Sequence, residues 1–141
     1  MRLVFGLLLV LPFQVFAQVE IGKPWARATA PGAKVAAGYM SIRNKAASAD
    51  RLIGVTSAAA ARVETHVTLR DGDIMRMREV KGYDIPAGGR FELEPGGAHL
   101  MFVDIRQPFR EGERVAATLT FEKAGEVKVE FQVEKLGGHR H

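Results

Sequence analysis

The fold is decided in residues 114–134, which read RVAATLTFEKAGEVKVEFQVE. Apolar and polar side chains alternate in both halves of this stretch, most regularly over residues 127–133. This period of two is typical of a β-strand with one buried and one solvated face. Residues 123–125 separate the two halves and predict a hairpin loop. The stretch therefore predicts an antiparallel pair of strands.

Segments of the same kind recur along the rest of the chain, separated by clusters of Gly, Pro and Asp. The predicted strands span residues 19–28, 35–43, 51–57, 61–70, 73–80, 90–93, 99–105, 114–122 and 126–134. Residues 58–61 have the length of one helical turn, but the flanking sequence shows no helical period. Closely spaced antiparallel strands predict an all-β sandwich or barrel. We expect Trp25 and Met40 to lie in its core.

The first 17 residues have the pattern of a secretory signal peptide. A positive charge precedes an apolar run over residues 3–11, and Ala17 supplies the small residue of a cleavage site. The run is too short to cross about 30 Å of hydrocarbon, although a retained membrane anchor is the alternative. We expect one exported domain over residues 18–136, without stable membrane insertion after cleavage, and a short flexible tail over residues 137–141.

The composition argues against several classes of function. The sequence contains no cysteine, which excludes the thiolate site of a blue-copper electron carrier and the Cys pair of a thioredoxin-like protein. The formal net charge is +4, but acidic and basic residues are interleaved, so we expect no binding to nucleic acid. No nucleophile with its base is recognisable, and we expect a monomeric protein that is not an enzyme.

Three short segments carry side chains that bind soft metal ions. The candidate ligands are His66, Met75, Met77, His99 and Met101. His99 and Met101 lie two residues apart on a predicted strand and therefore share a face. Thioethers are soft and neutral, so a set of two imidazoles and two thioethers favours Cu(I) over Ca²⁺, Mg²⁺ or Zn²⁺. For Met75, a filler of the core is the favoured interpretation and a metal ligand the alternative.

The Asp71-Gly72 pair connects two of these segments. Asp-Gly favours a two-residue hairpin loop, and this loop would place His66 directly opposite Met77 with Cβ atoms about 5 Å apart. Glu64 shares that face, where it is either a partner that orients the His66 ring or a plain surface carboxylate. The sequence thus predicts that the hairpin delivers an imidazole and a thioether to one ion.

The spacing of these residues resembles the motif of the PCuAC family of bacterial periplasmic copper chaperones. That motif is His, ten residues, Met, twenty-one residues, His, one residue, Met, and it is matched by His66, Met77, His99 and Met101. Further similarity lies in Trp25–Ala28, Pro31–Ala33, Gly38–Tyr39, Asn44 and Pro95–Gly97. The similarity covers residues 19–136, although many relatives have Met where this chain has Val67. The resemblance implies a cupredoxin-like Greek-key β-barrel.

The resemblance also implies a function, which is periplasmic Cu(I) delivery to the dinuclear copper centre of cytochrome c oxidase. Its implied partners are the copper-bearing oxidase subunit and Sco-type thiol proteins. Two alternatives stay open: a copper buffering or storage protein without a dedicated acceptor, and a secreted β-sandwich binding module. In the tail, His139 and His141 offer nitrogen ligands that suit Cu(II), which makes a second, weaker site a hypothesis.

Overall fold

The computed structural model describes residues 4, 6 and 18–135. Residues 18–135 form ten strands: β1 (Val19–Arg27), β2 (Val35–Asn44), β3 (Asp50–Thr56), β4 (Ala60–Asp71), β5 (Ile74–Val80), β6 (Tyr83–Ile85), β7 (Arg90–Leu93), β8 (His99–Ile105), β9 (Arg114–Phe121) and β10 (Gly125–Glu134). The predicted signal peptide, and the tail with His139 and His141, lie outside the described residues. The described part of the chain contains no helix long and apolar enough to cross a membrane.

The predicted strands are confirmed, with small shifts at their ends. Strands β7 and β8 have the predicted bounds, and β9 and β10 form the predicted hairpin with Phe121 paired to Gly125. Strand β6 was missed, because three residues are too few to show a period. Residues 58–61 form a turn and the start of β4 rather than a helical turn.

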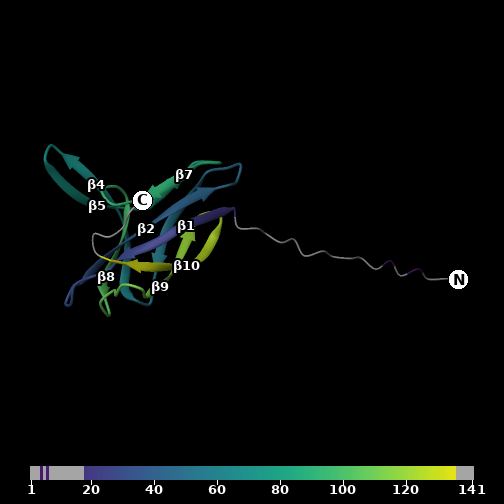
Figure 1. Ribbon diagram of the computed structural model, residues 1–141. Coiled ribbons are helices and arrows are strands. Elements are labelled where there is room, and N and C mark those ends of the chain that lie inside the picture. The colour runs from purple at the N-terminus through teal and green to yellow at the C-terminus, as the bar shows by residue number, and fades with distance from the viewer. Residues whose placement is uncertain (1–3, 5, 7–17, 136–141) are drawn as a thin grey trace.

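Seven of the strands close into a barrel (Figure 1). Their order is β4-β8-β2-β1-β10-β9-β3, and the ring is completed where Val55 of β3 pairs with Val63 of β4. Strand β1 runs parallel to β10 and antiparallel to β2. Strands β5, β6 and β7 attach to β4, β3 and β2, respectively. The predicted all-β barrel is therefore confirmed.

The barrel interior is filled by the inward faces of its strands. Met40 is buried there, as predicted, and Phe102 packs edge-on against both Phe109 and Phe131. Gly38 faces this aromatic group, and a Cβ added there would lie 2.8 Å from the Phe102 ring. Because the chain has no cysteine, this packing must stabilise the domain without a disulfide.

A β-bulge in β1 changes which side chains face the interior. Pairing with β2 advances by three residues on β1, from Gly22 to Trp25, while it advances by two on β2. One extra residue reverses the alternation of faces. Ala26 therefore enters the core cluster, whereas Trp25, although buried, packs on the outer face against Tyr39.

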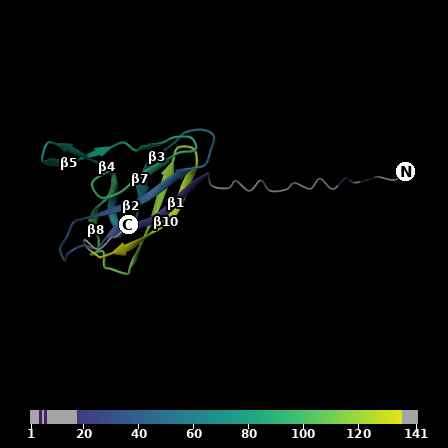
Figure 2. The ribbon, with the colours of Figure 1, turned by 45° about the horizontal axis from the view of Figure 1, so that its top comes forward.

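The β4–β5 hairpin projects beyond the barrel (Figure 2). Its register differs from the prediction, because Asp71 pairs with Ile74 and His66 pairs with Glu79. The direct pairing of His66 with Met77 was therefore wrong. Only Gly72 in this turn has positive φ, 61°, which suits a turn with Gly at its first central position. The predicted loop, with Asp71 and Gly72 as its two central residues, would be a type I′ turn and would require positive φ at Asp71 as well.

The register differs from the prediction by two residues, which leaves the faces of the hairpin unchanged. Met77 pairs with Thr68 and lies diagonally across from His66, on the same face. The opposite face of β5 carries Arg76 and Arg78, both exposed. These arginines are compatible with the fold because β5 is an edge strand outside the barrel wall.

Candidate metal-binding site

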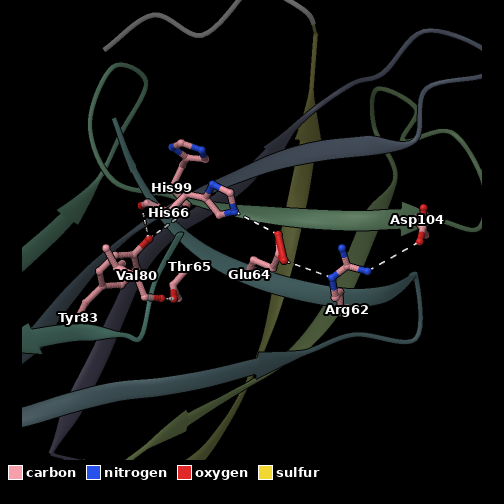
Figure 3. A network of polar contacts seen from close by, with 8 residues as sticks. All are labelled: Arg62, Glu64, Thr65, His66, Val80, Tyr83, His99 and Asp104. Carbon is pink, nitrogen blue, oxygen red and sulfur yellow. Dashed lines mark hydrogen bonds and ion pairs between the residues drawn. The ribbon is translucent and has the colours of Figure 1, made fainter. Parts of the chain in front are cut away.

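Strands β4 and β8 bring two histidines together on the outer surface of the barrel. His66 pairs directly with His99, and their ring centroids are 5.4 Å apart (Figure 3). His99 is 3% exposed, and the side chain of His66 is 14% exposed. The sequence placed both residues on one face of the barrel but missed their direct pairing, because no turn between β4 and β8 reveals the register.

Hydrogen bonds determine which nitrogen of each ring can bind a ligand. His99 Nδ1 lies 3.3 Å from the carbonyl oxygen of Gly97, and His66 Nε2 lies 3.2 Å from Glu64 Oε1. Both oxygens accept, so these nitrogens carry the protons and the other nitrogens carry the lone pairs. His66 Nδ1 and His99 Nε2 are buried and find no hydrogen-bond partner within the described chain. Two unpartnered lone pairs fit a metal ion.

Glu64 is the partner that orients the His66 ring, which confirms one of its two predicted roles. Its carboxylate also binds Arg62, which in turn lies 3.9 Å from Asp104 (Figure 3). The bonds from His66 and then Arg62 lower the pKa of Glu64. The carboxylate thus stays charged and holds the Nε2–H tautomer of His66, which leaves Nδ1 available.

Burial also favours the neutral form of His99. Desolvation lowers the pKa of this imidazole, the bond to Gly97 opposes the shift, and the neighbouring His66 adds to it. A neutral ring is the form that can donate a lone pair to a metal ion. The buried ring of His99 therefore has the protonation state that metal binding requires.

Tyr83 supports the histidine pair from the inner face of the barrel. Its hydroxyl oxygen lies 2.6 Å from the carbonyl oxygen of His66 and 2.7 Å from that of His99 (Figure 3). The phenol ring is 3% exposed and stacks on Phe91. Sequence reasoning missed this residue, since it lies on β6 and only the closed barrel brings it beneath both strands.

The methionines lie on the same face as the histidines. Met101 is half-buried on β8, two residues from His99 and opposite Glu64. Met77 and Met75 stand on β5 and are 64% and 52% exposed. All four motif residues therefore share one face, as predicted, with Met75 beside them. Their role as ligands stays a prediction.

A hollow of about 190 Å³ opens where the hairpin meets the barrel. Its lining residues are Arg27, Ala37, Tyr39, Thr68, Met75, Met77, Pro95, Gly96 and His99. Tyr39 stands beside His99 at a centroid distance of 6.5 Å and is covered by Trp25 at 4.6 Å. The Arg27 guanidinium lies 5.7 Å from the centre of the Tyr39 ring. The lining of the hollow thus includes an aromatic ring and two thioethers.

The available donors are two imidazole nitrogens and thioether sulfurs. The described residues hold no group of three or more His, Cys, Asp or Glu side chains placed to bind a metal ion. The thioethers of this face are the further donors that stand beside the histidine pair. Such a mixed set suits a soft monovalent ion better than a hard divalent one.

The barrel and this face define a cupredoxin-like domain of the PCuAC type. The structure of the "Copper-bound PCuAC domain from PmoF2" is 35% identical, with a TM-score of 0.74 over 84% of this chain and 94% of that one. The Cu(I) form of DR1885 from Deinococcus radiodurans is 27% identical, with a TM-score of 0.65 over 88% of this chain and 79% of that one. The predicted cupredoxin-like fold is confirmed.

Comparison of sequences identifies the family. A family model described as "Putative lipoprotein LpqE-like" matches residues 19–133. The "Putative lipoprotein Lxx21020" of Leifsonia xyli subsp. xyli is 31% identical over 121 residues, which cover 85% of this chain and 72% of that protein. The chain belongs to the LpqE-like family.

Proposed function

We propose that the protein is a non-enzymatic metallochaperone that carries Cu(I) on the outer face of its barrel. The ligands are His66, Met77, His99 and Met101. The observation that carries this proposal is the histidine pair, whose rings lie 5.4 Å apart with both lone-pair nitrogens buried and unpartnered within the described residues. The solved relatives described as copper-bound and as a Cu(I) form support the same cargo.

The site is suited to holding the ion and then releasing it. Neutral imidazoles and thioethers leave the single charge of Cu(I) in place, and the carboxylate of Glu64 is engaged by His66 and Arg62. Met77 is 64% exposed on an edge strand, so an acceptor ligand can approach the ion on this side. Transfer then proceeds by ligand exchange without a change of oxidation state.

The acceptor that we propose is the dinuclear copper centre of cytochrome c oxidase, with Sco-type thiol proteins as partners in the same assembly. The compartment is the periplasm, which agrees with the lipoprotein descriptions of the family and its relative. The protein acts as a monomer. The tail residues His139 and His141 bind Cu(II) as a second, weaker site.

The ligand set is tested by X-ray absorption of the Cu(I)-loaded protein lacking residues 137–141. Sulfur and nitrogen are expected together in the first shell, and scattering from light atoms alone would refute the thioether ligands. His99→Ala combined with Met101→Leu should abolish tight Cu(I) binding. Met40→Leu is the matched control, since Met40 is buried in the core.

The role in delivery is tested by mixing the Cu(I)-loaded protein with an apo copper domain of cytochrome c oxidase. Transfer of the ion supports the chaperone function. Tight binding without transfer favours copper buffering. Cu(I) binding that is weak in the wild type and no weaker in the His99→Ala/Met101→Leu variant favours a binding module unrelated to copper. For the tail, an unchanged Cu(II) stoichiometry after deletion of residues 137–141 would contradict the second site.

A further inference from the structure

We propose that Met75 is a second thioether donor that exchanges with Met77 at the exposed side of the copper site. This inference rests on the proposed function and concerns a residue outside the four-residue motif. In this scheme the ion is first held by the histidine pair, Met101 and Met77. Exchange of Met77 for Met75 loosens the ion from the histidine pair and moves it outward along the hairpin, toward an acceptor.

The placement of the two methionines supports this exchange. Met75 and Met77 are two residues apart on β5 and therefore point to the same side of the strand. Both line the hollow that also contains His99, and His99 Nε2 is one of the two buried nitrogens without a partner in the described chain. The hollow thus brings two thioether side chains and one of the paired histidines to a single space.

The positions along the hairpin give the exchange a direction. Cross-strand pairing sets His66 against Glu79, Thr68 against Met77, and Arg70 against Met75. Met75 therefore lies two residues further from the histidine pair than Met77, or about 7 Å along the strand. A methionine side chain has three rotatable bonds and adapts to such a displacement. An ion held through Met75 is closer to the turn and more accessible to a partner.

The exposure of Met75 is consistent with binding and inconsistent with a filler of the core. Met75 is 52% exposed, and β5 pairs only with β4 on the path of the sheet. Neither edge-strand methionine contributes to the buried core cluster. Two exposed thioethers on one face of a projecting strand are better explained by a shared ligand than by packing.

A double-mutant cycle of Met75→Leu and Met77→Leu tests the exchange. These substitutions conserve volume at exposed positions, so the fold should tolerate them. Cu(I) affinity is measured anaerobically by competition with bicinchoninate. Either single variant should lose less than about tenfold, whereas the double variant should lose about tenfold more than the product of the single effects, a coupling of about 1.4 kcal/mol. Independent effects that multiply would overturn the proposal.

The matched control moves the thioether to the wrong face. Ile74 neighbours Met75, is 56% exposed and points to the opposite side of β5. Ile74→Met added to the double variant restores a sulfur to the hairpin without restoring it to the hollow, and the affinity should not recover. Recovery would show that any exposed thioether suffices, which would overturn the specific role of Met75.

The same titrations separate this proposal from the proposed function. If His99→Ala leaves Cu(I) affinity unchanged, the copper site itself is wrong. If His99→Ala abolishes binding while the two methionine effects multiply independently, the copper site stands and only the exchange between Met75 and Met77 is rejected.

Discussion

The Tyr83 hydroxyl is the contact through which the barrel interior should influence copper binding. Tyr83→Phe removes one oxygen atom that lies 2.6 Å from the His66 carbonyl oxygen and 2.7 Å from the His99 carbonyl oxygen. The phenyl ring is retained, so stacking on Phe91, at a centroid distance of 4.6 Å, should persist. The substitution therefore isolates the hydrogen bonds from the packing.

The expected loss of stability follows from the single proton that the Tyr83 hydroxyl can donate. A phenol has one proton and can donate fully to only one carbonyl at a time, so the two contacts amount to about one hydrogen bond. A hydrogen bond of this kind contributes about 1 kcal/mol to the free energy of unfolding. In a domain of this size, that loss should lower the melting temperature by about 4 °C.

Tyr83→Phe should also weaken the binding of Cu(I). Without the hydroxyl, the backbones of β4 and β8 lose a shared contact beneath the histidine pair, and the imidazoles are held less firmly. Cu(I) affinity should fall by about threefold to tenfold, less than the roughly 10–100-fold that is typical when a partner of the ligand side chain is removed, because Tyr83 contacts only the backbone of the two histidines. Urea denaturation of the apo protein and competition with a Cu(I) chelator measure the two quantities.

The chain supplies its own control, because it contains one other tyrosine. Tyr39 stands beside His99, but its hydroxyl makes no hydrogen bond to the described residues that matches those of Tyr83. Tyr39→Phe should therefore change the free energy of unfolding by less than about 0.5 kcal/mol. If Tyr83→Phe is as stable as the wild type and binds Cu(I) equally well, the support attributed to this hydroxyl is refuted.

Three further predictions concern the surroundings of the site. Glu64→Ala should lower Cu(I) affinity about tenfold or more, because His66 loses the acceptor that sets its tautomer; Glu64→Gln, which still accepts a hydrogen bond, should lose less, and chelator competition measures both. Burial lowers the pKa of His99 from its ordinary value of 6.5, so the unfolded chain takes up this proton more readily and the apo protein should lose stability as pH falls below about 6.5. His99→Gln should make the free energy of unfolding depend less on pH, as measured by urea denaturation between about pH 7.5 and 5.5. An unchanged pH dependence would count against the buried neutral ring. Gly38→Ala should destabilise the fold by about 1–3 kcal/mol because the new methyl group meets Phe102, and calorimetry that shows no loss would contradict the packing.

Much of the fold was predictable from local patterns. The alternation in residues 114–134 determines the β9–β10 hairpin, and the bounds of β7 and β8 follow from the turns around them. Period two also places His99 and Met101 on one face, whatever the strand pairs with. These features depend on neighbours in the chain and need no knowledge of the tertiary contacts.

The register of the β4–β5 hairpin shows where local reasoning fails. The Asp71-Gly72 pair favours one turn, but a single glycine equally serves a turn in which it takes the first central position, and the structure adopts that one. The shift by two residues preserved the face of His66 and Met77 and changed their separation. The prediction of a shared face was therefore sound, whereas the predicted distance was wrong.

The sequence carries the donor types and their faces: imidazoles and thioethers at spacings that survive a two-residue change of register. Closure of the barrel supplies the rest, because it pairs His66 with His99, places Tyr83 beneath both backbones and sets Tyr39 against the hollow. Each of these contacts joins strands with no tight turn between them. Their register depends on how the whole barrel packs, and no local pattern encodes it.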